Sequence, residues 1–522
     1  MCSTAFQSFE KHFTSGEVHE RGRIAARQLS KRRTAQAIGS TRAPKSCGGC
    51  STMRKTSVAM TCILLATFGW GQQVNTPPDT LNHYKFRNVG GLGYPFSTFF
   101  SSDIAGFFTP SALNGKGDLA AIYLSKSNLA GSFVWSNGKS KGLPSLPNAN
   151  RGGGGSNALG ITNGGLVIGI SNDGEVSPFN NKLYNHAVSW KYGKLRNLGD
   201  LGGHDSNANS VNNSGLIVGL AFNATPDPYG YYGTQLHATT WRNGKITDLG
   251  TLGGTDSEAR LVNDSGQIIG ISFLNTPPMP PFNQPQDDAF LWSAGTMTDL
   301  GTLGGSFSAP SSINRSGQVS VISLDATNSV YQSFLWSNGT KTVLNSLGGS
   351  YVFALMLNDA ATVVGWNSDA ADNNVIATMW SPSGNGQSLG TIGTDTGSIA
   401  FGINNKGTIV GGSGVISLTT QTSYVHAFVW QKGQMLDLNT LIPAGSSLTL
   451  NVAYTINNAG IIAGLGTDKK GQTHPFVLEP DASNPGSFRS AASAPAAPGS
   501  SIRVPSPLQQ TLPKALALRE SR

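Results

Sequence analysis

The feature that most constrains this chain is an internal repeat, seen most clearly by comparing His237–Asp248, Asp288–Asp299 and His426–Asp437. Each of these segments runs through an Ala to a Trp, then a turn with Gly, then Asp-Leu. The Trp recurs at 135, 190, 241, 292, 336, 380 and 430, and Leu478 takes its place in the last copy, so successive markers lie 44 to 55 residues apart. A sustained period of this size indicates a repeat architecture.

A second marker, Asn-x-x-Gly followed by apolar residues, alternates with the first. It stands at Asn114, Asn212, Asn263, Asn314, Asn358, Asn404 and Asn457, with Thr162 in its place once and Ala361 replacing the Gly once. Eight copies of each marker, interleaved along the chain, predict eight copies of one structural unit.

Each copy reads as four short strands separated by Gly-containing turns. In the third copy these are Ala208–Asn212, Leu216–Leu220, His237–Trp241 and Lys245–Leu249. Asn-Gly and Ser-Gly between β-rich segments favour hairpins, because Gly adopts positive φ without steric cost. Four strands in a repeat of this length are typical of a β-propeller blade, whereas solenoid coils are shorter.

The two ends of the repeat region are complementary. Tyr84–Gly93 resembles Lys194–Gly202, the fourth strand of a copy, whereas the last copy ends at its third strand, His474–Leu478. We therefore predict an all-β fold, a β-propeller of eight four-stranded blades spanning 84–480, in which the N-terminal strand closes the last blade and covers its edge. A seven-bladed propeller and an open array of the same units remain as alternatives.

The net charge of +8 invites a nucleic-acid function, but its distribution argues against one. Residues 1–55 contain 11 of the 36 Lys and Arg residues and 3 of the 28 Asp and Glu residues, which accounts for the whole excess. The segment 84–480 has 20 basic and 22 acidic residues, so no basic stripe is available to follow a phosphate backbone. We expect no nucleic-acid partner.

The termini have the composition of segments outside the folded core. Residues 53–71 combine a basic start, a short apolar run and small residues, the pattern of a signal peptide that is too short to remain in a bilayer. We interpret 1–52 as a non-native or disordered basic leader and 481–522 as a disordered Ser/Ala/Pro-rich tail. All four Cys residues precede residue 72, so we expect a secreted, extracellular or periplasmic monomer without disulfides or stable membrane insertion.

The repeat also resembles a known family. The His/Asp-Ala-Phe-x-Trp strand, the Asp-Leu-Gly-Thr-Leu-Gly-Gly segment and the Ile-Asn-x-x-Gly-x-Ile-Val-Gly hairpin are similar to those of the HAF-repeat family of predicted bacterial extracellular repeat proteins. The similarity covers most of 84–480, with departures at Gly131, Gln332 and Ile376. The resemblance implies export, and it brings no established activity, catalytic residue or ligand.

The recurring polar residues favour structural roles. His186, His237, His426 and His474 share one position of four copies, and equivalent residues of a propeller lie on a circle rather than in one cluster. We therefore expect these His residues to bond a neighbouring blade, and Asp248, Asp299 and Asp437 to stabilise turns or contacts between blades. No nucleotide, metal-protease or hydrolase motif is present in the sequence, so we predict no catalytic residues, no metal site and no cofactor.

Departures from the repeat point to function. The spans from Gly169 to His186, Gly219 to His237 and Gly270 to Asp288 are 17 or 18 residues, against 10, 11 or 15 in the other copies. Aromatic residues on such extensions suit stacking on sugars or anchoring a protein. The predicted binding residues are Phe179, Tyr184, Phe222, Asp227, Tyr229, Tyr231, Tyr232, Phe273 and Phe282.

Two functions follow from these observations. The first is a secreted non-enzymatic β-propeller scaffold that binds a glycan or protein through the aromatic loops of repeats two to four. The alternative is a propeller-fold polysaccharide hydrolase or lyase, for which Asp205, Asp227, Asp287 and Asp288 are the candidate acids. No pairing of these acids is evident from the sequence.

Overall fold

The structure is a computed structural model that describes residues 83–90, 96–98, 112–125, 129–149, 155–227, 233–278, 285–418, 422–481 and 501–504. All described residues belong to the second of the two units into which the chain divides, Leu81–Arg522. The predicted leader and signal peptide, 1–52 and 53–71, lie outside the described residues. No helix within the described ranges is long and apolar enough to cross a membrane.

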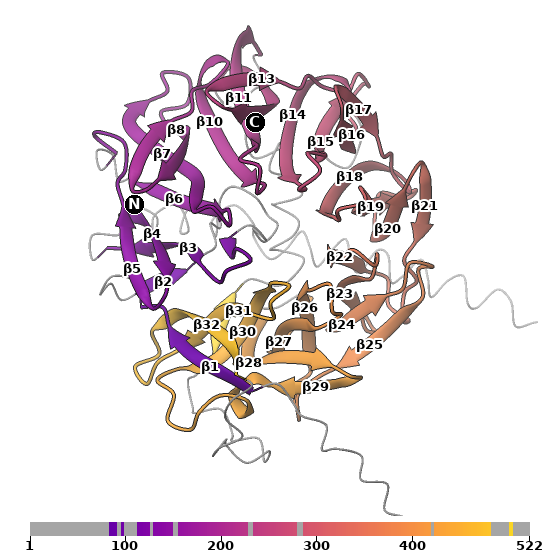
Figure 1. The fold of residues 1–522 in the computed structure, drawn as a ribbon. Coiled ribbons are helices and arrows are strands. Elements are labelled where there is room, and N and C mark those ends of the chain that lie inside the picture. The colour runs from indigo at the N-terminus through magenta and orange to yellow at the C-terminus, as the bar shows by residue number, and fades with distance from the viewer. Residues whose placement is uncertain are drawn as a thin grey trace, which may run out of the picture. The chain divides into compact units, whose positions relative to one another are not determined.

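The second unit is all-β, as predicted. Its described elements are strands, apart from the 3-10 helix Leu438–Thr440, and most of the strands pair into four-stranded antiparallel groups. Within this unit the sheets follow one another around a ring (Figure 1), and consecutive sheets are in contact. A ring of such sheets is the architecture of a β-propeller.

The sheets in the first half of the ring have the following strands. One sheet contains β2 (Phe96–Thr98), β3 (Leu119–Leu124), β4 (Ala130–Ser136) and β5 (Lys139–Leu143). The next contains β6 (Ser156–Ile161), β7 (Leu166–Val176), β8 (Leu183–Lys191) and β9 (Lys194–Asn197). The third contains β10 (Gly202–Val211), β11 (Ile217–Pro226), β12 (Thr234–Arg242) and β13 (Lys245–Asp248). The fourth group contains β14 (Gly253–Val262), β15 (Ile268–Leu274), β16 (Asp287–Ser293) and β17 (Thr296–Asp299).

The second half continues the pattern. It contains β18 (Gly304–Ile313), β19 (Val319–Asp325), β20 (Tyr331–Ser337) and β21 (Thr340–Val343), then β22 (Val352–Leu357), β23 (Val363–Ser368), β24 (Val375–Trp380) and β25 (Gly386–Gly390). It ends with β26 (Gly397–Ile403), β27 (Ile409–Val415), β28 (Thr422–Gln431) and β29 (Gln434–Asp437), followed by β30 (Thr449–Ile456), β31 (Ile462–Thr467) and β32 (Thr473–Asp481). One parallel pair, Asp287 with Phe307, joins β16 to β18.

The N-terminal strand pairs with the last sheet, as its sequence predicted. β1 (His83–Asn88) lies antiparallel to β32, with Tyr84 opposite Pro480 and Asn88 opposite Phe476. The sheet order is β1, β32, β31, β30, so β1 occupies the place of the fourth strand. The Tyr84 side chain is buried, which fixes this strand to the core by an apolar contact as well as by the backbone.

The C-terminal segment differs in part from its prediction. Within 481–522, which the composition predicts to be disordered, residues 502–504 form strand β33 (Ile502–Val504). β33 pairs antiparallel with the first residues of β28. Ile502 is buried in the main hydrophobic cluster, and the burial of this aliphatic side chain explains why a strand forms here.

The Asn markers form a hydrogen-bonded series from one sheet to the next. In each marker turn the Asn Oδ1 accepts backbone N–H groups, for example those of Ser214 and Leu216 at Asn212. Its Nδ2 donates to the backbone carbonyl of the next marker over 2.9 to 3.2 Å. These bonds run from Asn114 to Thr162, from Asn212 to Asn263, then to Asn314, Asn358, Asn404 and Asn457, and from Asn457 back to Asn114.

The Trp and Gly positions of the repeat are explained by packing. Trp190, Trp241 and Trp380 are buried, and the Nε1 of Trp380 donates to the Asn345 carbonyl of the preceding sheet at 2.9 Å. A Cβ at Gly270 would lie 1.9 Å from the Glu258 carbonyl oxygen and 2.6 Å from the Phe290 ring. The second strand therefore requires Gly where the Phe of the third strand covers it.

Candidate functional site

The functional candidates gather at one edge of the sheets, which we call the loop edge. In an antiparallel four-stranded sheet, the connection from second to third strand and the connection onward to the next sheet lie at the same end. The hairpins that join first to second and third to fourth strands lie at the opposite end. The position of the repeated His, at the start of the third strand, is therefore at the loop edge, and so is the repeated Asp at the end of the fourth.

Much of the extra length predicted to be loops in the second and third copies is strand. β7 and β11 have 11 and 10 residues, and they extend as paired hairpins in which Val176 lies opposite Leu183 and Pro226 opposite Thr234. In the fourth copy β15 ends at Leu274 and β16 begins at Asp287, so there the insertion is a connection.

The structure separates the predicted binding residues into three groups. Phe179 is 57% exposed in the connection after β7, and Tyr184 on β8 is half-buried, its ring 5.8 Å from that of His204. Phe222 and Phe273 are buried in the core, so the prediction that they stand on exposed loops is wrong. They lie in β11 and β15, where the strand continues further than the sequence suggested.

Of the remaining predicted binding residues, one is buried and four lie outside the described residues. Asp227 is buried, and its backbone N–H donates to the Gly233 carbonyl at 3.0 Å. Tyr229, Tyr231, Tyr232 and Phe282 lie outside the described residues. Phe179 and Tyr184 are therefore the two predicted aromatic residues that the structure places where a ligand can reach them.

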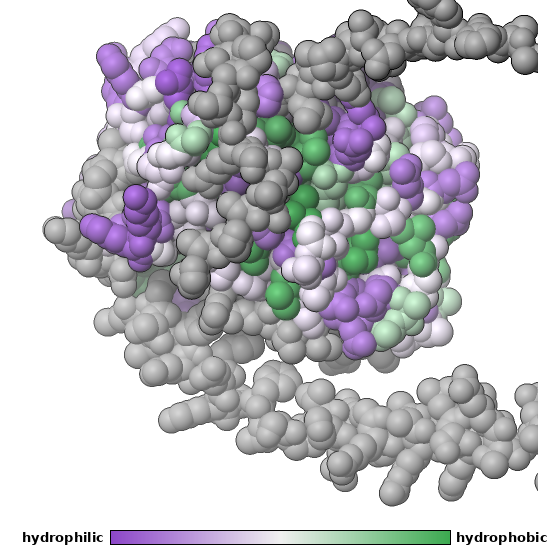
Figure 2. Space-filling model, turned by 90° about the horizontal axis from the view of Figure 1, so that it is seen from below, coloured by the Kyte–Doolittle hydropathy of each residue, from purple (hydrophilic) through white to green (hydrophobic). Residues whose placement is uncertain are grey.

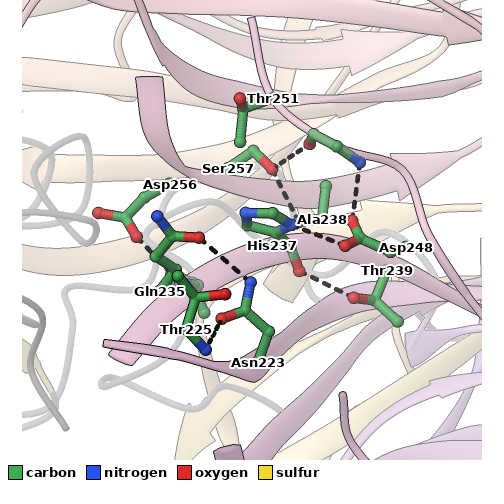
Figure 3. A network of polar contacts seen from close by, with 12 residues as sticks. Asn223, Thr225, Gln235, His237, Ala238, Thr239, Asp248, Thr251, Asp256 and Ser257 are labelled. Carbon is green, nitrogen blue, oxygen red and sulfur yellow. Dashed lines mark hydrogen bonds and ion pairs between the residues drawn. The ribbon is translucent and has the colours of Figure 1, made fainter. Parts of the chain in front are cut away.

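A His–Asp pair lies at the loop edge of the β10–β13 sheet (Figure 3). The Nδ1 of His237 is 2.8 Å from the Oδ2 of Asp248, and the other carboxylate oxygen accepts the Gly250 N–H at 2.8 Å. Burial by itself would raise the pKa of Asp248, but the hydrogen bonds from His237 and Gly250 outweigh it and hold that pKa below its usual value.

The same network connects this sheet to the next. The Ala238 N–H donates to the Ser257 hydroxyl at 2.8 Å, and the Ser257 hydroxyl donates to the Gly250 carbonyl at 2.6 Å. The Leu236 N–H donates to Asp256 Oδ1 at 2.9 Å (Figure 3). Asp205 has the equivalent role one sheet earlier, where it accepts the Asn185 N–H at 2.7 Å. Asp205 thus holds two sheets together and is engaged as a structural acceptor.

All four repeated His residues pair with a carboxylate, but within their own sheet rather than with a neighbouring one. His186 lies 3.0 Å from Asp173, His474 lies 3.3 Å from Asp468, and His426 lies 2.9 Å from Asp395, which immediately precedes β26. The expected bond to a neighbouring blade is therefore wrong. The strand register explains this for three of them, because the His side chain projects beside the end of the second or fourth strand of the same sheet, whereas His426 meets Asp395 beside the start of the first strand.

The β14–β17 group carries an acid in place of the His. Asp288 occupies the His position, and Asp299 stands where Asp248 stands one copy earlier. Burial is the main cause that raises the pKa of Asp288 to about 7; the hydrogen bond from Gln286 opposes it, and the charge and hydrogen bond of Asp299 act in the same direction as burial. The sequence did not reveal this pairing, because Asp299 reads as an ordinary repeat residue until its partner changes from His to Asp.

A buried polar cluster lies on the first strands of two of these groups. On β14 the Nε of Arg260 is 3.4 Å from the Oε2 of Glu258, and the Nδ2 of Asn209, on β10, donates to Glu258 Oε1 at 3.0 Å. Burial raises the pKa of Glu258 even though Arg260 and Asn209 favour its ionised form. The equivalent positions of β22 are Phe353 and Leu355, so the first strands change from polar to apolar around the ring.

These groups allow hydrogen bonding and proton exchange, and they do not assemble a metal site. Within the described ranges no three His, Cys, Asp or Glu residues are placed to hold a metal ion. On the face seen in Figure 2, hydrophobic residues are interspersed with hydrophilic ones. The loop edge therefore offers aromatic residues beside carboxylates and imidazoles.

Comparisons with known proteins give only distant similarities. No protein-family model matches the chain, and no curated protein matches its sequence. The β-propeller domain of the Trilobed protease from Pyrococcus furiosus is similar over 63% of this chain and 94% of that one, with 9% identity and a TM-score of 0.37. A prolyl endopeptidase is similar over 73% of this chain and 55% of its own, with 12% identity and a TM-score of 0.42.

A lectin from Aleuria aurantia, solved with Fucα1-6GlcNAc, is also similar. The similarity covers 54% of this chain and 96% of the lectin, with 10% identity and a TM-score of 0.27. TM-scores this low carry no inference about activity or ligand.

Proposed function

We propose that this protein is a secreted, monomeric, non-enzymatic β-propeller of eight four-stranded blades that binds a glycan or protein partner at the loop edge of its second to fourth sheets. Membership of the HAF-repeat family and export through a signal peptide starting near Met53 are part of this proposal. The observation that carries the binding role is the exposure of Phe179, in the connection that leads from β7 to β8, together with the half-buried Tyr184 near the start of β8.

Two contacts support a closed ring. β1 pairs with β32 although the two strands are separated by nearly the whole repeat region. The Asn457 Nδ2 donates to the Asn114 carbonyl at 2.9 Å, which links the last marker to the first in the same way as consecutive markers are linked. A seven-bladed ring would leave one of the eight marker turns without a place in this series.

The hydrogen bonds that these carboxylates accept from the backbone support a non-enzymatic scaffold function. Asp205 and Asp256 accept backbone N–H groups of the preceding sheet, and Asp248 and Asp299 accept those of Gly250 and Gly301. Acids held by such bonds serve the fold. Aromatic rings exposed among polar groups are the usual means of holding a sugar face or an anchor residue of a protein.

The test is ligand binding by variants at the loop edge. Phe179→Ala and Tyr184→Ala should each weaken retention on a glycan array or a protein partner by about ten-fold, the loss typical of removing an aromatic anchor. Tyr192→Ala is the matched control, because Tyr192 is 86% exposed in the β8–β9 hairpin at the opposite edge. Equal losses for Tyr192→Ala and Phe179→Ala, or no loss for any variant, would contradict the proposed surface.

A polysaccharide hydrolase or lyase is the second candidate, and the Asp288–Asp299 pair is the observation that favours it. A carboxyl group with a pKa of about 7 beside a second carboxyl group is suited to general acid catalysis. Hydrolysis of a polysaccharide panel that is lost in Asp288→Asn, with unchanged binding, would establish the enzyme. If the protein binds glycans but hydrolyses none of them, the non-enzymatic scaffold is the function that the result supports.

A further inference from the structure

The edge of β28 at Thr422–Tyr424 is covered by the C-terminal segment instead of by its own sheet. β29 pairs with β28 only from Phe428 to Gln431. Nearer its start, β28 pairs with β33, where Tyr424 lies opposite Ile502 and Thr422 opposite Val504. The other edge of this part of β28 is taken by β27. A three-residue segment from the tail thus fills a strand position that the repeat leaves open.

The position next to β33 has an aromatic lining. Tyr424 is buried and its ring lies 5.8 Å from Phe401 in an edge-to-face arrangement, while the Phe401 ring lies 4.9 Å from Tyr454. Ile502 is buried in the same hydrophobic cluster as these three rings. One aliphatic side chain of an added strand therefore meets a prepared apolar surface, and the backbone pairing supplies the rest of the contact.

The chain's own segment leaves this position imperfectly satisfied. Within the described part of the chain, the Thr422 Oγ1 and the Tyr424 hydroxyl are buried without a hydrogen-bond partner. Buried polar groups in native proteins are nearly always bonded, and each exception weakens the arrangement that contains it. Two buried hydroxyls on the strand that receives β33 thus lack hydrogen bonds in this arrangement, which lowers its stability.

We infer that the Thr422–Tyr424 edge is a binding site for an extended peptide with an aliphatic side chain, and that residues 502–504 occupy it as a built-in ligand. Recognition is by strand addition, in which main-chain hydrogen bonds supply affinity and a side-chain pocket supplies specificity. Because the built-in segment is tethered, it competes at an effective concentration of about a millimolar, and the free site is exposed only when the segment is released.

Peptide binding to the full chain tests this inference. The probe is a fluorescent peptide with the sequence of residues 500–506, and its binding is followed by anisotropy. The Ile502→Asp full chain should release its own segment and bind the probe at least about ten-fold more tightly than the unaltered chain does. A probe carrying the same Ile-to-Asp change is the matched control and should bind neither protein.

A second experiment keeps every native side chain of the site. A protease site inserted after residue 490 allows the segment to be cut from the folded protein, so that the labelled peptide can exchange with it. We expect uptake of the label and release of the C-terminal fragment, detected by mass spectrometry. A folded Ile502→Asp chain that fails to bind the probe, or a cleaved chain that takes up none, would overturn the inference. Both results are independent of ligand binding at the loop edge of the second to fourth sheets.

Discussion

At the scale of residues, one position of the repeat carries different chemistry in different copies. In the β10–β13 sheet it is His237, which pairs with Asp248 at 2.8 Å. In the next group it is Asp288, which faces Asp299. A His–Asp pair gains from charge attraction, whereas two neighbouring carboxyl groups retain a proton. The change from His to Asp therefore converts a stabilising pair into a proton-sharing one.

This difference predicts how stability depends on pH. The folded pKa of Asp288, about 7, lies above its ordinary value of 3.8, so folding favours its protonated form. The free energy of unfolding should therefore decrease as pH rises from about 4 to about 7 and level off above that. Asp288→Asn should remove this decrease and stabilise the protein at pH 8 by about 1 kcal/mol or more. Urea unfolding at pH 5 and pH 8 measures both effects.

The control for this prediction is Asp264→Asn, because Asp264 lies in the exposed β14–β15 marker turn, at the opposite end of the strands from Asp288. Its substitution should leave the pH dependence of unfolding unchanged. If the free energy of unfolding of Asp288→Asn still decreases between pH 5 and pH 8, a group other than Asp288 causes the decrease.

At the scale of elements, the marker turn performs two tasks with one side chain. Asn314 accepts the N–H groups of Ser316 and Gln318 through Oδ1, which fixes the turn, and its Nδ2 donates to Asn358 of the next sheet. Thr162 preserves only the first task, since its Oγ1 accepts the Leu166 N–H at 3.1 Å and it has no amide to donate onward. At that joint the Asn163 backbone N–H donates to Asn213 Oδ1, a bond that other joints make in addition to the Asn link, as between the Asn213 N–H and Asp264.

Thr162→Asn should therefore add the missing link. We expect the free energy of unfolding to increase by about 0.5–1.5 kcal/mol, the usual net contribution of one hydrogen bond. Asn314→Ala provides the reference in the opposite direction and should cost about 1–3 kcal/mol, because it leaves buried groups unpaired. Chemical denaturation of the three proteins gives both values, and a neutral Thr162→Asn beside a costly Asn314→Ala would show that the link adds nothing at that joint.

The elements could be predicted from the sequence where local turn chemistry decided them. Gly and Asn between β-rich segments fixed four strands per copy, and the Trp positions predicted core residues such as Trp190 and Trp380 correctly. The sequence could not show that Phe222 and Phe273 continue buried strands, because an aromatic residue after a hairpin is compatible with either strand or loop. Nor could it show β33, whose order depends on the distant partner Tyr424.

The candidate site was harder to predict than the fold for the same reason. The pairing of Asp288 with Asp299 and of Glu258 with Arg260 and Asn209 depends on which side chains share a face of a sheet. Repeat positions alone indicate equivalence between copies and not contact within them. Departures from the repeat at Glu258 and Arg260 are the signal that could have identified the buried cluster.

At the scale of the whole molecule, the two ends of the repeat region depend on each other. β1 covers β32 with six register pairs, from His83 opposite Asp481 to Asn88 opposite Phe476. Tyr84 is 2% exposed and packs in the cluster that includes Phe476 and Leu478. Without β1, the edge of β32 and this apolar surface would be open, and an open strand edge promotes association between chains.

Two chains that differ only in β1 test this dependence. A chain starting at Leu81 retains β1, whereas a chain starting at Gly90 lacks it. We expect the shorter chain to lose about 3 kcal/mol or more of stability, because it forfeits the burial of Tyr84 and the backbone pairing. It should also associate as its concentration rises, whereas the longer chain remains monomeric, as measured by light scattering after size exclusion. Equal stability and equal mass for both chains would mean that β1 is dispensable, and the ring would then have to be held by the Asn457–Asn114 link and the contacts between β2 and β32.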